Sequence, residues 1–286
     1  MTPTVTSPIV DIAWLTGALR EGAPVVVLEV MDDPSTPGRV DGSIVVDWAS
    51  LVWHESRREL ADAAVIARRL ADLGAGPGSI VVLAGDPTQF AAYVLWAARV
   101  VGVDADLRYL DGGVAALARI APGRIAGTDL TCHRPARPAS DERFGAGVPD
   151  PSAVVDRAGV AAASDSPATV VVDMRSPEEF AGTRVAPPSM PVDHGAVRAG
   201  RIPGARHLHA LDLLDADGRI RDRETLRRSV SDVVGAANDV ILYCRLAHRA
   251  ALGWLVFTDV LGLDGVRVYE GSWTEWGSVV GAPVER

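Results

Sequence analysis

The sequence predicts an α/β protein of two tandem domains, each a parallel sheet with helices on both faces. Short apolar runs alternate with segments of helical spacing, a pattern typical of parallel strands joined by helices. A series of strand and turn motifs in the first half recurs in the same order in the second half. The length of 286 residues is sufficient for two domains of ordinary size.

Composition limits the classes of protein that are possible. Hydrophobic residues make up 48% and charged residues 23%, a globular balance with material for two cores. The net charge of −9 disfavours nucleic acid or an anionic membrane as a partner. A small anionic substrate stays possible, because the local field of a site can oppose the net charge. No apolar stretch approaches the roughly 20 residues of a membrane span, and the first residues do not resemble a signal peptide, so we expect a cytoplasmic protein.

The only two cysteines are Cys132 and Cys244. In a cytoplasmic protein we expect both to be free thiols. Cys132 stands beside His133, but no second pair follows at metal-ligand spacing. His207 and His209 alternate along an expected strand and lack a third ligand. The sequence therefore predicts neither a metal site nor a cofactor.

The elements of the first half follow from apolar periodicity and turn residues. Continuous apolar runs indicate buried parallel strands, and Gly74 is placed to end a helix. We expect helices at 11–20, 61–73 and 91–101, strands at 25–30, 44–48, 79–83 and 107–110, and a turn at 38–43.

A segment rich in Pro, Gly, Ala and Arg separates the two halves and has weak apolar periodicity. We expect it to be an ordered connector along the domain surface. The predicted organisation is a first domain at 1–125, a linker at 126–151 and a second domain at 152–286.

The second half repeats the landmarks of the first. Residues 170–175 match 25–30, 200–205 match 38–43, 240–243 match 80–83, and 266–272 match 107–113. The second copy has a longer insert, at 176–199. It also has Cys244 where the first copy has Ala84-Gly85-Asp86. The first domain therefore lacks the thiol, and we expect it to be inactive, with a structural or site-covering role.

Cys244 ends an expected buried strand and precedes a helical pattern. This puts it at the carboxyl edge of the sheet, where open α/β sheets bind their ligands. Loop N–H groups and the start of the helix favour a thiolate there. The alternative is a buried structural cysteine. Arg245, His248 and Arg249 argue against it, because three polar side chains are costly to gather at a burial site.

At this point the chain resembles a tandem rhodanese, a thiosulfate sulfurtransferase of the bacterial type. The resemblance covers nearly the whole chain and rests on four motifs of the second half: VDMRSPEEF at 172–180, GRIPGA at 200–205, YCR at 243–245 and YEGSWTEW at 269–276. Asp86 resembles the aspartate that often stands in the inactive domain. The resemblance implies a persulfide on Cys244 and transfer of the sulfane sulfur of thiosulfate to a thiophilic acceptor, such as cyanide, a thiol or a protein.

The resemblance also implies roles for the loop. Cys244 is the expected catalytic residue. Arg245 and Arg249 are expected to hold the sulfonate of the donor through charge-assisted hydrogen bonds, the alternative being surface solubility. The full set of expected substrate contacts is Arg245, Leu246, Ala247, His248, Arg249 and, at the entrance, Arg184.

The loop departs from the family pattern at one position. Similar bacterial loops read Cys-Arg-x-Gly-x-Arg, whereas Ala247 stands in the glycine place. If the loop needs a positive φ there, alanine costs about 1 kcal/mol of strain. Nearby, we expect Asp173 and Arg175 to brace the sheet edge, and Trp273 and Trp276 to pack at the domain interface.

Three other functions compete with thiosulfate sulfurtransfer. A phosphatase of related fold uses Cys-x5-Arg, and the shorter Cys-x4-Arg spacing here disfavours it. A 3-mercaptopyruvate sulfurtransferase resembles this chain, but its loop is small and neutral whereas this loop is basic. A sulfur-relay module without turnover is the third alternative.

Overall fold

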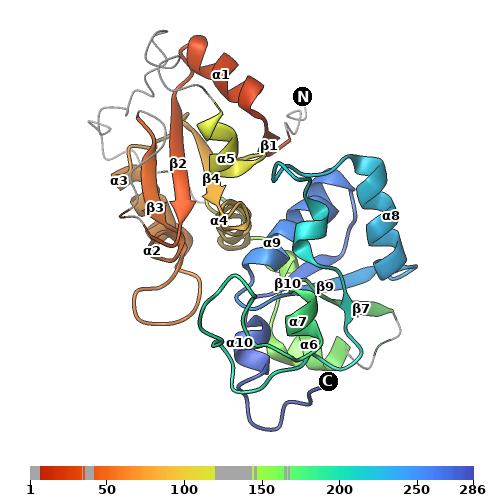
Figure 1. Cartoon of the computed structure of the whole chain (residues 1–286). Coiled ribbons are helices and arrows are strands. Elements are labelled where there is room, and N and C mark those ends of the chain that lie inside the picture. Colours follow the sequence, from red (N-terminus) through yellow and green to blue (C-terminus); the bar gives the residue numbers. More distant parts are fainter. Residues whose placement is uncertain are drawn as a thin grey trace. The chain divides into compact units, whose positions relative to one another are not determined.

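The computed structural model describes residues 7–33, 35, 42–119, 144, 147–163, 166 and 168–286 (Figure 1). The chain divides into two compact units, Met1–Asp150 with Ala216–Arg219, and Pro151–Asp215 with Ile220–Arg286. Most of the predicted linker, with Cys132 and His133, lies outside the described residues. Each unit is built on a five-stranded sheet in which every strand pair is parallel.

The sheet of the first unit has the order β1-β5-β4-β2-β3. Alternate residues of its central strands face opposite helical layers. One face, with Val27 and Val82, packs on Leu15 of α1 and on Val114 of α5. The other face contacts α4. The elements are β1 (Ile9–Val10), α1 (Ile12–Arg20), β2 (Val25–Met31), β3 (Ile44–Asp47), α2 (Trp48–Val52), α3 (Ala63–Asp72), β4 (Ile80–Asp86), α4 (Gln89–Val101), β5 (Asp106–Leu110) and α5 (Gly113–Ala118).

The sheet of the second unit has the same arrangement, β6-β10-β9-β7-β8. Its elements are β6 (Val154–Val155), α6 (Arg157–Ala163), β7 (Thr169–Asp173), α7 (Pro177–Phe180), β8 (Arg206–His207), α8 (Arg223–Val234), β9 (Asp239–Tyr243), α9 (His248–Leu255), β10 (Val266–Tyr269) and α10 (Ser272–Trp276), with 3-10 turns at Pro151–Ala153 and Ala210–Leu213 and a π-helical turn at Val256–Val260. No helix among the described residues is long and apolar enough to cross a membrane.

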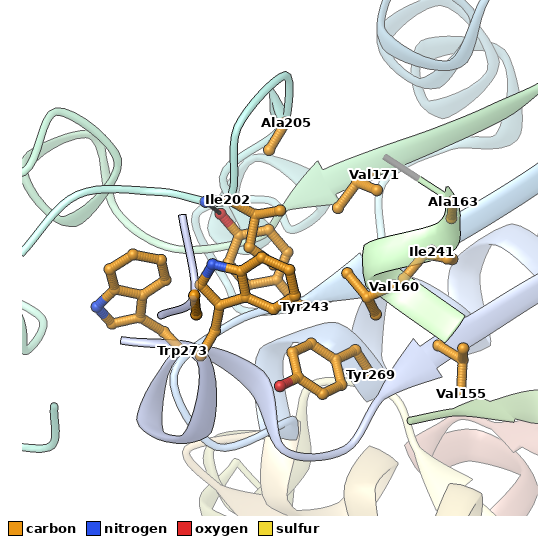
Figure 2. Packing of buried hydrophobic residues seen from close by; sticks show 12 residues of the cluster. Val155, Val160, Ala163, Val171, Ile202, Ala205, Ile241, Tyr243, Tyr269 and Trp273 are labelled. Carbon is orange, nitrogen blue, oxygen red and sulfur yellow. Dashed lines mark hydrogen bonds between the residues drawn. The ribbon is translucent and has the colours of Figure 1, made fainter. Parts of the chain in front are cut away.

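Helices cover both faces of this second sheet too. Val171, Ile241 and Tyr243 share a hydrophobic cluster with Val160 of α6 and Trp273 of α10 (Figure 2). On the opposite face α9 packs so closely that a Cβ on its Gly253 would lie 2.8 Å from the Met174 side chain. The predicted fold class, two tandem parallel α/β domains with helices on both faces, is confirmed.

Strand register gives the equivalence between the two halves. Val25 pairs with Ile80 in the first sheet, and Thr169 pairs with Asp239 in the second. If Val25 and Thr169 are equivalent, the positive-φ residues that follow β5 and β10, Gly113 at φ 53° and Ser272 at φ 52°, are equivalent as well, and Gly85 then stands at the place of Cys244. Asp86 therefore corresponds to Arg245, one position beyond the cysteine. A Cβ at Gly85 would lie 2.7 Å from the carbonyl oxygen of Thr88, so the first unit has no room for a side chain there without a shift.

Several element boundaries differ from the expected ones for local reasons. The strand expected at 44–48 ends at Asp47, because the Asp47 carboxylate accepts the N–H of Ser50 and begins α2. The strands β1 and β6 were not predicted, since two residues are too few to show a period. The helix expected at 61–73 runs from Ala63 to Asp72 and is followed by Gly74 at φ 90°.

Candidate active site

The site lies where β9 gives way to α9. β9 is held between β7 and β10, and Val240 to Tyr243 are buried. Cys244 follows the strand, and α9 begins at His248. Ala247 caps the helix with φ 67° and ψ −12°, in the left-handed region. The loop therefore does require a positive φ in the glycine place, at the cost of about 1 kcal/mol expected for alanine.

Cys244 is a free thiol and is only 1% exposed. Its neighbours Arg245 and Leu246 are partly exposed, whereas Ala247 is buried. The sequence left a reactive thiol and a buried structural cysteine as alternatives, and the structure shows that Cys244 is buried.

Ser272 organises the inner side of the loop. Its Oγ accepts the N–H groups of Cys244 and Ala247, each at 3.2 Å, and donates to the carbonyl of Tyr269 at 2.8 Å. Ser272 is fully buried and has φ 52°. The expectation that the loop N–H groups together surround the sulfur therefore needs correction, because two of them are bound to this hydroxyl.

The start of α10 holds the loop carbonyls. The N–H of Trp273 donates to the carbonyl of Cys244 at 2.9 Å. The N–H and the hydroxyl of Thr274 both donate to the carbonyl of Arg245, at 3.2 and 2.8 Å. In a planar trans peptide the N–H points opposite to the C=O. The N–H groups of Arg245 and Leu246 therefore both point away from α10, and successive N–H groups on one side form an anion-binding concavity.

Arg249 is held in a buried ion pair. Its two terminal nitrogens donate to the carboxylate oxygens of Glu179 at 2.6 and 2.9 Å, and the Glu179 side chain is fully buried. Glu179 also accepts the N–H of Ser176 in a capping box that begins α7. Burial acts to lower the pKa of Arg249, but the hydrogen bonds and charge of Glu179 outweigh it, and the net shift is upward.

Arg245 lies under the insert that the second half adds. Its Nε donates to the carbonyl of His194 at 3.2 Å, and its Nη2 lies 3.3 Å from Nε2 of the same residue. Gly195 has φ 122°, and a Cβ there would meet the Arg245 guanidinium at 2.5 Å. Sequence reasoning missed His194, because an exposed histidine in an irregular segment shows no pattern. Figure 1 shows the long irregular course of this segment after α7.

The remaining predicted residues have other positions. Arg184 donates to the carbonyls of Ala186 and Met190, so it folds the insert upon itself. His248 is buried at the first turn of α9 and does not face solvent. Within the described ranges, no three His, Cys, Asp or Glu side chains gather as a metal site requires.

A buried polar network braces the strands beneath the loop. Arg175 binds Asp173 through Nε and Nη2, the latter at 2.6 Å, and also donates to the carbonyl of Gly200. The Tyr243 hydroxyl donates to Asp173, and the Arg175 guanidinium lies 4.5 Å from the Trp273 ring centre. Burial acts to lower the pKa of Arg175, and Asp173 more than compensates, so the pKa is raised. Asp173 and Arg175 thus brace the sheet, as predicted.

The two tryptophans that were expected at the domain interface, Trp273 and Trp276, have a different position. Trp273 and Trp276 belong to the hydrophobic cluster of the second unit, where both are buried (Figure 2 labels Trp273). Their indole N–H groups donate to the carbonyls of Arg198 and Pro283. Both side chains are therefore part of this unit's own core.

Each unit has one parallel sheet, and in the second unit a cysteine loop joins a strand to a helix. These features define a rhodanese-like α/β protein. A comparison with sequence families agrees, since the profile described as "Rhodanese-like domain" matches residues 157–278. A protein of Mycolicibacterium smegmatis named "Putative thiosulfate sulfurtransferase" is 31% identical over 281 residues, with 97% of each chain covered. A sulfur carrier protein of Thermus thermophilus is 31% identical over 285 residues, covering 97% of this chain and 96% of that one.

Solved structures share the fold. An anaerobic ergothioneine biosynthesis enzyme from Chlorobium limicola, in complex with trimethyl histidine, superposes with a TM-score of 0.76 at 21% identity. The match covers 97% of this chain and 70% of that one. The chain belongs to the rhodanese family of sulfurtransferases, on the strength of its full-length relatives.

Proposed function

We propose that the protein is a thiosulfate sulfurtransferase with one active site, at Cys244 in the second domain. The observation that carries the proposal is the position of Cys244 between β9 and α9, with the Cys244 and Arg245 carbonyls turned toward α10. The thiosulfate sulfurtransferase names of full-length relatives support the same substrate. The first domain has Gly85 at the equivalent place, so we assign it no thiol chemistry.

The proposed reaction has two half-reactions. The Cys244 thiolate attacks the outer sulfur of thiosulfate, a new S–S bond forms, and the original S–S bond breaks as sulfite leaves with its electron pair. The acceptor, cyanide or a thiolate, then attacks the terminal sulfur of the persulfide and Cys244 leaves as thiolate. Covalent catalysis of this kind gives ping-pong kinetics.

Charge around the sulfur supports the thiolate and the persulfide anion. The N–H groups of Arg245 and Leu246 point away from α10, and the start of α9 contributes positive partial charge at His248. We assign the sulfonate of the donor first to Arg245, a partly exposed residue that follows the cysteine directly in the chain. Its Nη2 also lies 3.3 Å from Nε2 of His194.

A donor-binding role for Arg249 stays a prediction, and the Glu179 ion pair argues against it. Both terminal nitrogens of Arg249 are engaged by a buried carboxylate. A sulfonate would have to displace Glu179 and leave it buried without its counter-charge, which is costly. Leu246, Ala247 and His248 would then contribute through the backbone of the loop.

A sulfur relay to a protein acceptor is the second candidate. It is favoured by the Thermus thermophilus relative, which is named a sulfur carrier protein and matches this chain over nearly its full length. In this case the persulfide forms on the same Cys244, and only the donor and the acceptor differ.

Thiocyanate formation with cyanide tests the proposal. We expect turnover with thiosulfate, slower turnover with 3-mercaptopyruvate, and none with either donor in Cys244→Ser. Faster turnover with 3-mercaptopyruvate than with thiosulfate would make 3-mercaptopyruvate the donor in place of thiosulfate. No turnover with both donors, together with persulfide on Cys244 delivered by a partner protein, would establish the relay.

A further inference from the structure

We infer that Thr274 is a positioning residue for sulfur transfer, acting through its hydroxyl on the peptide group between Arg245 and Leu246. The inference rests on the proposed function of Cys244 and adds a residue of α10 to it. Thr274 lies inside the YEGSWTEW motif, but the sequence assigns it no role of its own.

Two donors meet on the Arg245 carbonyl, and they differ in quality. The N–H of Thr274 is 3.2 Å from the oxygen, at the long end of the usual range, whereas its hydroxyl is at 2.8 Å. The hydroxyl is thus the shorter bond of the pair. Without it a single long bond would hold this carbonyl, at a partly exposed position where water competes.

The orientation of this carbonyl determines the orientation of the Leu246 N–H, because the peptide is planar. The neighbouring Cys244 carbonyl is fixed by the N–H of Trp273, which orients the Arg245 N–H in the same way. Two successive N–H groups then point to the side opposite α10. The proposed role requires the Cys244 sulfur to lie on that side, where rotation of the Arg245–Leu246 peptide would place a carbonyl oxygen against its negative charge.

Of the three α10 residues that contact the loop, only Thr274 has a contact that a conservative side-chain substitution removes cleanly. The Ser272 hydroxyl accepts two N–H groups of the loop, and the residue is fully buried at a positive φ, so its replacement disturbs packing and backbone together. Trp273 acts through its backbone N–H. At Thr274 the hydroxyl can be removed by the isosteric change Thr274→Val, which keeps the backbone N–H.

A matched control is present in the same unit. Thr258 is partly buried, like Thr274, and its hydroxyl donates to the carbonyl of Trp254 at 2.8 Å. Thr258→Val therefore removes a hydroxyl–carbonyl bond of the same length, beyond the end of α9, together with a 3.1 Å contact to the Asp259 carboxylate. If the Thr274 hydroxyl has only a structural role, Thr274→Val and Thr258→Val should give the same result.

The experiment measures the rate at which iodoacetamide alkylates Cys244 in the full chain, followed by peptide mass spectrometry so that Cys132 does not contribute. This readout does not depend on any sulfur donor. We expect Thr274→Val to react about three- to tenfold more slowly than wild type, the size of one lost hydrogen bond. Thr274→Ser should recover at least half of the wild-type rate, and Thr258→Val should equal wild type.

Thiosulfate assays on the same four proteins separate the two claims. We expect kcat/KM for thiosulfate to fall in Thr274→Val in parallel with alkylation. If Thr274→Val alkylates as fast as Thr258→Val, or faster, the positioning role is wrong even where thiosulfate turnover is intact. If alkylation slows as expected but no variant and no wild type uses thiosulfate, the positioning role stands and the assigned donor fails.

Discussion

The ion pair between Glu179 and Arg249 gives the sharpest stability prediction. It joins the first turn of α7 to the first turn of α9, elements 70 residues apart in the chain. Glu179 is fully buried and the Arg249 side chain is 10% exposed. Glu179→Gln keeps the shape and one acceptor oxygen but leaves the guanidinium without a counter-charge in the protein interior.

Removing one partner of a buried pair costs about 3–5 kcal/mol, and the remaining amide oxygen places this variant near 3 kcal/mol. For a protein of this size that loss lowers Tm by roughly 10 °C. Differential scanning calorimetry at neutral pH measures it. Adding Arg249→Met to Glu179→Gln should recover part of the loss, because the unpaired charge is then removed as well.

The matched control is Glu224→Gln in the same unit. Glu224 lies 3.7 Å from Arg228, and both side chains are more than half exposed. An exposed pair of this kind contributes no more than about 0.5 kcal/mol. Glu179→Gln melting within about 2 °C of Glu224→Gln would refute the assignment and return Arg249 to the donor site.

Three further outcomes are expected. Ala247→Gly should keep turnover and change the free energy of unfolding by less than about 1 kcal/mol, because relief of the positive φ is offset by the greater freedom of the unfolded chain. Ala247→Val should lower the free energy of unfolding by more than about 2 kcal/mol. Chemical denaturation measures both variants. Burial lowers the pKa of His209, with Asp212 opposing it. The unfolded chain then binds the proton more readily than the folded chain, so the free energy of unfolding falls as pH drops from about 7 to 5. His209→Gln should therefore reduce the slope of Tm against pH in this range. Equal slopes for wild type and variant would contradict this. Cys132→Ser should leave thiosulfate turnover nearly unchanged, and a large loss would place that residue in the mechanism.

The sequence predicted what depends on periodicity and on residue type. Apolar runs located the central strands, and the repeat of landmarks anticipated two sheets of one design. The positive φ at Ala247 followed from the loop pattern. Cys244 was singled out because a nucleophilic residue type ended a buried strand, and the structure places it there.

What the sequence did not predict depends on long-range pairing. The sequence assigned Arg249 to the sulfonate and gave no sign of its ion pair with Glu179, 70 residues away. Ser272 and Thr274 were read as parts of a motif, and their contacts with the loop appear only once β10 is set beside β9. His194 reaches Arg245 from an irregular insert that has no period.

Mass spectrometry of the intact protein after incubation with thiosulfate tests the central claim most directly. We expect one added sulfur atom, located on the peptide that contains Cys244, removed by cyanide and absent in Cys244→Ser. An unmodified Cys244, or sulfur added equally to Cys244→Ser, would contradict the account.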